Sequence, residues 1–344
     1  MSAPLLIWGA GAIGGTIGAY LIRAGVDVLF VDQAADHVAA LNADGLSIEG
    51  PIEAFTVPAR AVGPEDVQGP FPAIWLCTKA QHTDAATCQL APHLAPGGHV
   101  LSLQNGLNEL TIGGLIGAEN TLGAFVNFGS DYLGPGRILF GGRAAVVVGE
   151  LDGSDSQRLA ETHRLLSIFE PNAIMTPEIW GYLWGKLGYG ALLFATALTN
   201  DSIADVLARD AYRPVLTALA RELTELAVAQ GVAPKGFNGY DPTAFAPGAA
   251  PAAADASFDA MVAHNRTSAK SHSGIWRDLA VRKRKTEVDP QLTLPISIGA
   301  EQGYDMPLTH RLVGLIQDIE AGRRPLSWET LDALKATFED GGQG

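Results

Sequence analysis

The sequence predicts an α/β protein in which a doubly wound, mainly parallel sheet is followed by an all-helical C-terminal domain. Three observations predict this fold class. A glycine-rich turn joins the first apolar run to a helix, short apolar runs alternate with helical segments through the first half, and strand signals fade after Ser154. Alternation of this kind implies parallel strands joined by right-handed crossovers.

The length and composition favour two globular domains. The chain has 344 residues, of which 47% are hydrophobic, and a single hydrophobic core stops growing below that length. Pro171 and Pro177 interrupt the pattern where the helical half begins, and prolines often mark such boundaries. We therefore expect an α/β domain over residues 1–172 and a helical domain over residues 173–344.

Charge and composition disfavour several classes of partner. The formal net charge of −14 opposes binding to phosphate backbones, so we expect no nucleic-acid partner. Cys77 and Cys88 are too few for a disulfide framework, which favours a cytoplasmic protein. No apolar run reaches the roughly 20 residues that span a bilayer, and the start lacks the basic region of a secretory signal, so we expect no membrane association. The eight histidines lack paired ligand spacing, and we expect no metal site.

The elements of the first half follow the order that a doubly wound sheet requires. Residues 4–8 form a short apolar run typical of a buried strand. The helical spacing after the glycine turn stops near Gly25, which suits a C-terminal cap. Further strands are expected over residues 26–31, 73–77 and 99–103, with a helix over 84–94.

Two stretches depart from this alternation. Apolar runs over 121–128, 138–140 and 144–148 are separated by Gly-Pro-Gly and Gly-Gly, so we expect an antiparallel edge that closes the sheet. Residues 231–256 are rich in Ala, Pro and Gly, and this composition predicts a long loop or lid inside the helical half.

The glycine-rich turn, Gly9-Ala10-Gly11-Ala12-Ile13-Gly14, matches a dinucleotide-binding fingerprint. In a chain with 40 glycines the bare pattern carries little information, but here a buried strand precedes it and a helix follows. The first glycine makes the turn, the second lets the backbone approach a pyrophosphate, and the third allows close helix packing. The alternative is a glycine bend without a ligand. We predict a Rossmann-like domain whose turn binds the cofactor through Gly9, Gly11, Ala12, Ile13 and Gly14.

Asp32 ends the second predicted strand and bears on the choice of cofactor. A carboxylate at this place accepts hydrogen bonds from the adenosine ribose and repels a 2′-phosphate, which favours NAD over NADP. The following residues, Gln33-Ala34-Ala35-Asp36, contain no base that could bind such a phosphate. A solvated turn carboxylate is the alternative, and NADP is not excluded.

Four short motifs occur in a characteristic order along the chain. They are Leu76-Cys77-Thr78-Lys79-Ala80, Leu103-Gln104-Asn105-Gly106, Trp184-Gly185-Lys186-Leu187 and Thr286-Glu287-Val288-Asp289. This order resembles the ketopantoate reductase (2-dehydropantoate 2-reductase) family, and the likeness extends over nearly the whole chain. The resemblance implies a Rossmann-like N-terminal domain, a helical C-terminal domain, an active site in the cleft between them, and a homodimer.

The resemblance also implies roles for four residues. Lys79 and Asn105 would contact cofactor and substrate, Lys186 would be the general acid that protonates the carbonyl, and Glu287 would help to hold the substrate hydroxyl. Each has a structural alternative. Lys79 is otherwise a solvated loop lysine and Lys186 a surface lysine of an amphipathic helix. Asn105 is otherwise part of an ordinary tight turn, and Glu287 part of a charged, solvated face.

Carbonyl chemistry gives an independent reason for a lysine. Hydride addition builds negative charge on the carbonyl oxygen, and a nearby ammonium stabilises that charge and donates the proton. In the oxidative direction a neutral lysine takes the proton from the alcohol, and desolvation lowers a lysine pKa in the required direction.

The chain departs from the family pattern at two places. Family members usually carry an asparagine one helical turn after the lysine, where it binds substrate hydroxyls, and here that position is Gly190. The reductases generally use NADPH, with a basic or neutral residue near the position of Asp32. Both departures suggest an NAD-dependent relative that acts on another small hydroxy acid or polyol.

The stretch 270–289 supplies three further candidates. By the resemblance, Ser273 matches a serine that approaches the substrate. His272 beside it is a possible second acid or base because its ordinary pKa lies near neutral, or else a capping or core histidine. Arg277, next to Trp276, is a candidate contact for a substrate carboxylate. We expect the basic run 282–285 to be a solvated helix end.

Three functions stay open at this point. The first is an NAD(P)-dependent oxidoreductase that interconverts a small hydroxy acid or polyol and its carbonyl by hydride transfer, as an NAD-preferring dehydrogenase with Lys186 as general acid and base. The second is an authentic NADPH-dependent 2-dehydropantoate 2-reductase. The third is a non-catalytic dinucleotide redox sensor, against which the presence of both Lys186 and Glu287 argues.

Overall fold

The first apolar run forms strand β1 (Leu5–Trp8) near the middle of an eight-stranded sheet. Because side chains alternate along a strand, Leu5 and Ile7 pack into the core on one face of the sheet, while Leu6 and Trp8 pack into the core on the other. A continuous apolar run is therefore what a strand covered on both faces requires.

The computed structural model describes residues 3–267 and 271–341. The chain divides into two compact units, Met1–Ile179 and Trp180–Gly344. Residue 270, where the stretch with the further candidates begins, lies outside the described residues. The division falls a few residues after the predicted boundary at 172/173, because a short strand at 174–175 still pairs within the sheet of the first unit.

The main sheet has the strand order β12-β11-β8-β7-β6-β1-β2-β5. Neighbouring strands are parallel except β8 and β11, which pair antiparallel. The carboxyl ends of β1, β2, β6, β7 and β8 therefore meet along one edge of the sheet. Its further strands are β2 (Val28–Val31), β5 (Ala61–Val62), β6 (Phe71–Leu76), β7 (Leu94–Ser102), β8 (Thr121–Val126), β11 (Val146–Glu150) and β12 (Ile174–Met175).

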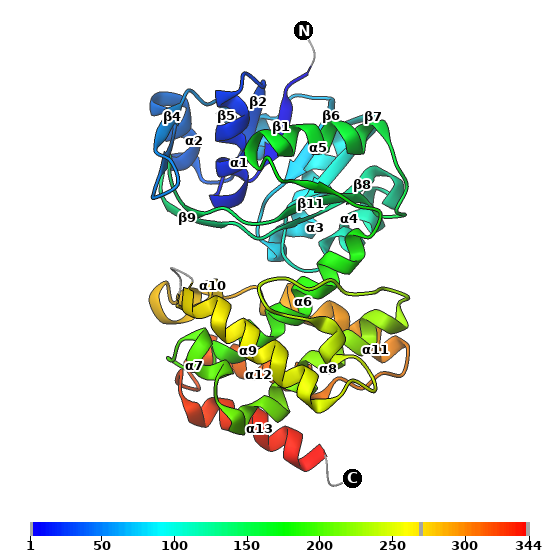
Figure 1. Cartoon of the computed structure of the whole chain (residues 1–344). Coiled ribbons are helices and arrows are strands. Elements are labelled where there is room, and N and C mark those ends of the chain that lie inside the picture. Colours follow the sequence, from blue (N-terminus) through cyan, green and yellow to red (C-terminus); the bar gives the residue numbers. More distant parts are fainter. Residues whose placement is uncertain (1–2, 268–270, 342–344) are drawn as a thin grey trace. The chain divides into compact units, whose positions relative to one another are not determined.

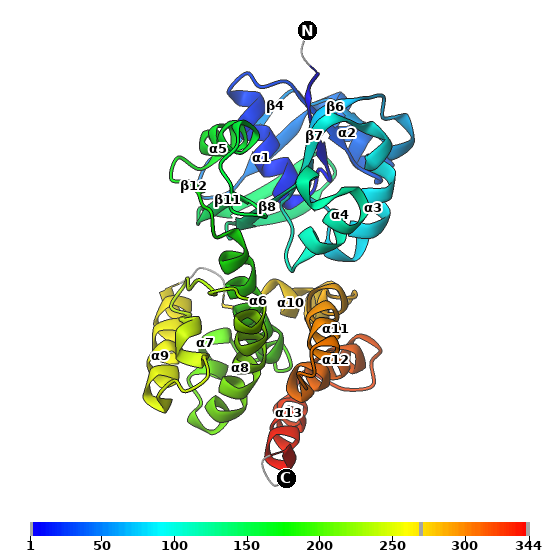
Figure 2. The ribbon, with the colours of Figure 1, turned by 90° about the vertical axis from the view of Figure 1, so that its right-hand side faces the viewer.

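Helices cover both faces of this sheet. In Figure 2, α1 and α5 lie together on one face, and α3 and α4 lie together on the other. The helix bounds are α1 (Ala12–Arg23), α2 (Ala35–Asp44), α3 (Thr83–Leu90), α4 (Asn108–Ile116) and α5 (Gln157–Phe169). The arrangement confirms the predicted doubly wound sheet and the helix after the glycine turn.

One predicted strand belongs elsewhere. Residues 138–140 lie in β10, which is not part of an edge that closes the main sheet. It joins a separate four-stranded sheet of order β4-β3-β10-β9, with bounds β3 (Leu46–Glu49), β4 (Phe55–Val57), β9 (Gly129–Gly134) and β10 (Arg137–Gly142). This small sheet packs on α1, where a Cβ at Gly15 would overlap the side chain of Ile138.

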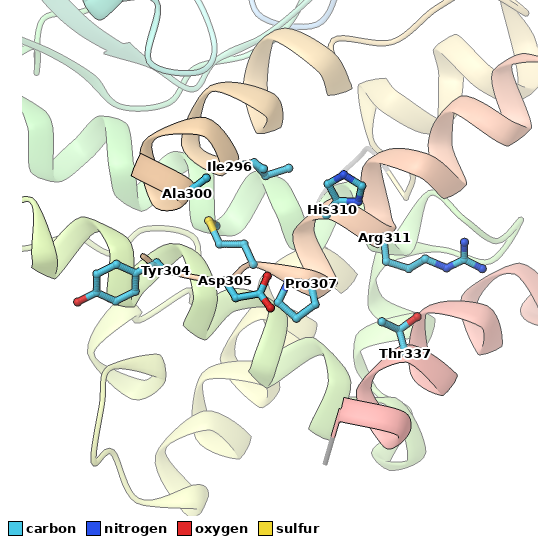
Figure 3. Close-up of a pocket in the computed structure, with 9 residues that line it drawn as sticks. Ile296, Ala300, Tyr304, Asp305, Pro307, His310, Arg311 and Thr337 are labelled. Atoms are coloured by element: carbon cyan, nitrogen blue, oxygen red, sulfur yellow. The ribbon is translucent and has the colours of Figure 1, made fainter. Parts of the chain in front are cut away.

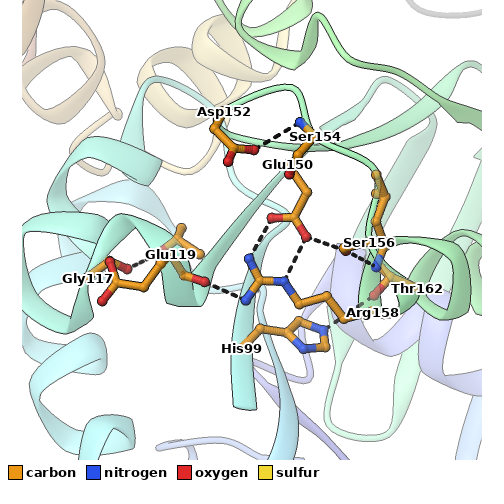
Figure 4. Close-up of polar contacts among 11 residues, drawn as sticks. His99, Gly117, Glu119, Glu150, Asp152, Ser154, Ser156, Arg158 and Thr162 are labelled. Atoms are coloured by element: carbon orange, nitrogen blue, oxygen red, sulfur yellow. Dashed lines mark hydrogen bonds and ion pairs between the residues drawn. The ribbon is translucent and has the colours of Figure 1, made fainter. Parts of the chain in front are cut away.

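A partly buried ion pair joins α5 to strand β11 of the main sheet (Figure 4). Arg158 on α5 donates from Nε to Oε1 of Glu150 at 2.7 Å, and Ser156 donates to the same carboxylate. His99 of β7 lies beside this pair and contacts Thr162. Charged groups buried in this way are retained because each one has a hydrogen-bonded partner.

The second unit is built of helices, and Phe237 and Tyr240 form its isolated β-bridge within the described residues. The helices are α6 (Ile179–Thr196), α7 (Ile203–Leu207), α8 (Arg213–Ala229), α9 (Pro251–Thr267), α10 (Gly274–Trp276), α11 (Leu294–Glu301), α12 (Pro307–Glu320) and α13 (Trp328–Gly341) (Figure 1). No helix in the described part of the chain is long and apolar enough to cross a membrane.

The prediction of a long loop over residues 231–256 holds for residues 231–250, which contain a 3-10 turn at Pro242–Phe245 and an isolated bridge but no α-helix, and it is wrong beyond them. Residues from Pro251 onward are the first turns of α9. The part before it is packed, because Tyr240 and Phe245 are buried and their rings stack at 5.3 Å. Apolar side chains hidden among the Ala, Pro and Gly residues fix this segment to the helices.

The glycines of α6 explain how the segment approaches so closely. A Cβ at Gly181 would lie 2.7 Å from the carbonyl oxygen of Ala233, and a Cβ at Gly185 would overlap the carbonyl oxygen of Lys235. Gly181 in turn accepts a hydrogen bond from the Lys235 N–H at 2.8 Å. Gly181 and Gly185 are therefore required by backbone packing, although glycine weakens a helix.

Candidate functional site

The glycine turn has the geometry of a ligand cradle. Gly9 has φ +103°, and a Cβ there would lie 2.9 Å from the carbonyl carbon of Cys77. A Cβ at Gly14 would overlap the carbonyl oxygen of Gly9. At Gly11 a Cβ would meet no described atom within 4 Å. Packing thus requires the first and third glycines, and the second borders open space that a ligand can approach.

The N-terminus of α1 opens onto this space. Gly11 is its N-cap, and within the described chain no side chain caps the helix and no acidic residue lies in its first turn. Uncapped N–H groups and the helix dipole favour an anion at this point, so Ala12, Ile13 and Gly14 suit a pyrophosphate. The residues present therefore fit a dinucleotide.

Asp32 lies directly after β2 and contacts the turn. Its Oδ2 accepts a hydrogen bond from the Ala10 N–H at 2.9 Å, and its Oδ1 accepts one from the Ala34 N–H at 3.0 Å. The side chain is half-buried. The carboxylate is thereby fixed beside the glycine turn, as the fingerprint requires.

Lys79 and Asn105 follow the adjacent strands β6 and β7. Gln104 joins the two turns, because its Nε2 donates to the Thr78 carbonyl oxygen at 2.9 Å. Asn108 Nδ2 donates to the carbonyl oxygen of Asn105 at 2.6 Å. Lys79 is half-buried and Asn105 is exposed. The first unit thus brings the glycine turn, Asp32, Lys79 and Asn105 to one edge of its sheet.

His37 is a residue of this edge that the sequence analysis missed. The imidazole is buried, and its Nε2 lies 3.0 Å from the carbonyl oxygen of Ala10. Its Nδ1 accepts a hydrogen bond from the Gly136 N–H at 3.0 Å. A lone histidine in a helix gives no sequence signal for this contact, because Gly136 lies in a distant hairpin.

In the second unit, α6 carries Lys186 and Gly190 on one half-buried face, since helical residues four apart lie above one another. Gly190 differs from the packed glycines of α6: a Cβ there would meet only Oε1 of Gln291, at 3.9 Å, among the described atoms. Gln291 lies one helical turn from Glu287, to whose carbonyl oxygen its N–H donates at 3.1 Å. The side chain of Gln291, one turn from Glu287, therefore approaches α6 at Gly190, one turn from Lys186.

The candidates near residue 273 make local contacts. Ser273 caps α10, because its Oγ accepts a hydrogen bond from the Trp276 N–H at 3.1 Å. His272 Nε2 lies 3.1 Å from the carbonyl oxygen of Asn200, and its ring is tilted against that of Trp276 with centroids 4.0 Å apart. Arg277 follows directly, half-buried in a π-helical turn over 277–281.

The basic run after this turn is partly neutralised. Arg282 and Arg284 both donate to Oδ1 of Asp278 at 2.9 Å. Asp278 is buried, whereas the run itself is exposed. These two arginines therefore stabilise the buried carboxylate of Asp278.

A pocket of about 390 Å³ lies in the second unit between α11, α12 and α13 (Figure 3). Its lining comprises Ile296, Ala300, Tyr304, Asp305, Met306, Pro307, His310, Arg311 and Thr337. None of the predicted site residues is among them. Within residues 3–267 and 271–341, no group of three or more His, Cys, Asp or Glu could hold a metal ion.

The glycine cradle, the carboxylate after β2 and the separate lysine-bearing helical unit define a class of protein, the dinucleotide-dependent oxidoreductases of two domains. The first unit matches the family model "Ketopantoate reductase PanE/ApbA" over residues 5–153, and the second matches its C-terminal model over residues 178–320. The chain belongs to the ketopantoate reductase family, as the motifs predicted, and it is an oxidoreductase that acts on CH–OH donors.

Individual relatives agree with this assignment. A 2-dehydropantoate 2-reductase of Archaeoglobus fulgidus is 27% identical over 92% of this chain and 97% of its own length. The crystal structure of a PanE/ApbA family ketopantoate reductase from Ralstonia eutropha aligns with TM-score 0.76 and 26% identity over 93% of this chain and 99% of its own. A D-mandelate dehydrogenase, solved with NADH and anilino(oxo)acetate, shares the fold with TM-score 0.79 and 20% identity over 93% of this chain and 99% of its own.

Proposed function

We propose that this family member is an NAD-preferring dehydrogenase that interconverts a small hydroxy acid or polyol and its carbonyl compound, with Lys186 as general acid and base. The observation that carries the cofactor preference is Asp32, whose carboxylate is held beside the glycine turn by the Ala10 N–H. A fixed negative charge at the ribose accepts hydrogen bonds from two hydroxyls and repels a 2′-phosphate.

The first unit would hold the cofactor. The N–H groups at the start of α1 bind the pyrophosphate, and Asp32 binds the adenosine ribose. Lys79 and Asn105, at the ends of neighbouring strands, contact cofactor and substrate. When bound, the nicotinamide cofactor supplies or accepts the hydride.

The second unit would supply the proton. The Lys186 ammonium stabilises charge that develops on the carbonyl oxygen and protonates it, and in the oxidative direction its neutral amine takes the proton from the alcohol. Glu287 accepts a hydrogen bond from the substrate hydroxyl. Support comes from the approach of Gln291 to Gly190, since Gln291 lies one turn from Glu287 and Gly190 one turn from Lys186.

The remaining candidates would act on the substrate's other groups. Arg277 binds a carboxylate, which a guanidinium does with two parallel hydrogen bonds. Ser273 contributes a polar contact, although its Oγ also caps α10. His272 is the alternative acid or base, and its contact with the Asn200 carbonyl oxygen supports a structural task as well.

The substrate is proposed from Gly190. An asparagine here would present a carboxamide to substrate hydroxyls, whereas glycine leaves that volume open beside Gln291. A hydroxy acid or polyol with a larger substituent than pantoate fits such a space. We further propose that the protein is a cytoplasmic homodimer, which light scattering on the purified chain would test.

A second candidate function is an authentic NADPH-dependent 2-dehydropantoate 2-reductase. The relatives' name favours it, since the Archaeoglobus fulgidus protein aligns over 92% of this chain. Asp32 and Gly190 argue for the first proposal. A dinucleotide sensor without catalysis is the third candidate, and the presence of both Lys186 and Glu287 argues against it.

One screen separates these functions. Initial rates are measured for hydroxy acids, sugar acids and polyols with NAD and NADP at alkaline pH, and for 2-dehydropantoate with NADH and NADPH at neutral pH. The proposal predicts NADH formation from a hydroxy compound and slower turnover with the phosphorylated cofactor. Fast NADPH oxidation by 2-dehydropantoate would establish the second function, and cofactor binding without turnover of any compound would establish the third.

A further inference from the structure

An exposed aromatic ring lies next to the acidic end of β2. Tyr132 on β9 is 40% exposed, and its ring meets the edge of the His37 ring with centroids 5.1 Å apart. The strand belongs to the small sheet and packs against α1. A large exposed aromatic side chain next to a binding cradle is a common feature of ligand contacts.

His37 fixes this hairpin to the glycine turn. Because the Gly136 N–H donates to Nδ1, that nitrogen is unprotonated, so Nε2 carries the hydrogen and donates to the Ala10 carbonyl oxygen at 3.0 Å. The Ala10 N–H is bonded to Asp32 in turn. Ala10 therefore binds Asp32 at the end of β2 through its N–H. Through its carbonyl oxygen it binds His37, which in turn binds the hairpin at Gly136.

Further contacts join the hairpin to α1. Thr16 Oγ1 and Ser130 Oγ lie 2.8 Å apart, and Ser130 also donates to the carbonyl oxygen of Leu139 at 3.0 Å. Ser130 and Tyr132 both belong to β9. The strand is therefore held at Ser130, two residues before the exposed ring, and the ring itself is held by His37. The ring thus has a defined position relative to the cradle.

The electrostatic environment of the phenol points to the same end of the site. Partial burial raises the pKa of Tyr132, and the carboxylates of Asp36 and Asp32 raise it further. Their negative potential therefore reaches the phenol hydroxyl. Such a place suits the neutral, hydroxyl-rich ribose and purine of adenosine and disfavours an added phosphate.

We propose that Tyr132 is a cofactor-binding residue whose ring forms the outer wall of the adenosine side of the dinucleotide site, with His37 as the positioning residue that holds it there. The assignment rests on the proposed dinucleotide-dependent function. The ring supplies a face for the purine or ribose, and stacking of a base on an aromatic side chain is sequence-tolerant and strong enough to measure.

The test is a fluorescence titration of the purified full chain with two probes. NADH contains the adenosine, and reduced nicotinamide mononucleotide lacks it. Tyr132→Leu removes the ring, Tyr132→Phe keeps the ring without its hydroxyl, and His37→Ala removes the anchor. Tyr304→Leu is the matched control, because Tyr304 is 41% exposed and belongs to the second unit.

We expect Tyr132→Leu to raise the Kd for NADH by about 10-fold or more, as loss of a stacking partner does, and Tyr132→Phe by about 3-fold or less. His37→Ala should weaken NADH binding in the same direction. Tyr132→Leu should not change the Kd for the mononucleotide, which a general loss of structure would do. Tyr304→Leu should bind both probes as the wild type does.

Two results would overturn the assignment. Wild-type NADH affinity in Tyr132→Leu would show that the ring contributes nothing. Equal weakening of both probes would show that the substitution perturbs the fold and not the adenosine side. A wild-type chain that binds neither NADH nor NADPH would instead refute the proposed function, and the assignment with it.

Discussion

At the scale of single residues, Asp32 has two tasks that one substitution can separate. Its carboxylate accepts hydrogen bonds from Ala10 and Ala34, and it sets the charge at the proposed ribose site. The first task affects every dinucleotide equally. The second affects NADH and NADPH in opposite directions, so the ratio of their Kd values reports it alone.

Asp32→Asn should therefore lower the ratio of Kd for NADPH to Kd for NADH by about 10-fold, which corresponds to ~1.4 kcal/mol. The side chain keeps its size and an acceptor oxygen but loses the charge that repels a 2′-phosphate. Titrations with both cofactors give the ratio. Asp84→Asn, at an exposed position in the first turn of α3, is the control, and an unchanged ratio in Asp32→Asn would exclude Asp32 as the source of discrimination.

Gly190 is the residue that bears most on the substrate. Gly190→Asn places a carboxamide in the volume beside Gln291, and we expect it to reduce kcat/KM for the best hydroxy compound by about 10-fold, mainly through KM. Gly190→Ala, which adds one methyl, should have a smaller effect. Steady-state kinetics together with the Kd for NADH check this, and a loss of NADH affinity would mean that Gly190 does not act through the substrate.

Residue roles were predictable only where the sequence carries a motif. Asp32 and the glycines follow from the fingerprint, because backbone geometry dictates them. Gln291 and His37 carry no such signal. Their partners, Gly190 and Gly136, are distant in sequence, and such pairs meet only through the packing of whole elements.

At the scale of elements, α6 combines two kinds of glycine. Gly185 lies against the carbonyl oxygen of Lys235, whereas Gly190 faces open space. Gly185→Ala should lower the free energy of unfolding by about 1–3 kcal/mol, because backbone must move to admit the methyl group. Gly190→Ala should raise it by about 0.5–1 kcal/mol through helix propensity.

Urea titrations of the two variants and of the wild type measure these two changes in the free energy of unfolding. Each has the same added methyl group in the same helix, so the difference between them isolates packing against the 233–240 segment. Equal changes in the two variants would contradict the account of why α6 tolerates its glycines.

The elements themselves were predictable where hydrophobic periodicity decides, as in β1, α1 and β2. Residues 138–140 were assigned to the wrong sheet, because a short apolar run reports burial but not its partner strand. The loop predicted over residues 231–256 ends at Pro251, where α9 begins, and the composition gave no sign that Tyr240 and Phe245 are buried in the part before it.

At the scale of the whole molecule, the buried groups of Figure 4 predict a loss of stability in acid. Burial lowers the pKa of His99 to about 4, with the nearby Arg158 acting in the same direction. Burial acts to raise the pKa of Glu150, but hydrogen bonds from Arg158 and Ser156 outweigh it and lower the pKa. In the unfolded chain both groups bind protons more readily.

Stability should therefore fall as the pH falls through the window from about 6.5 to 4, where the unfolded chain protonates His99 and the folded chain does not. The loss is on the order of 3 kcal/mol for this histidine. The contribution of Glu150 is lost at still lower pH. Urea titrations at several pH values check this, and His99→Gln should flatten the dependence within the window. An unchanged slope in that variant would assign the effect to other groups.

The central claim is that the Lys186 ammonium performs the proton transfer, and Lys186→Met tests it most directly. Methionine keeps much of the side chain's bulk without the charge, and Lys335→Met, which removes a partly exposed lysine of α13, is the control. Steady-state kcat with the best substrate is measured together with the Kd for NADH. The account predicts that kcat falls by about 10²–10⁴-fold while the Kd stays at the wild-type value. A variant that turns over within about 3-fold of the wild type would contradict it.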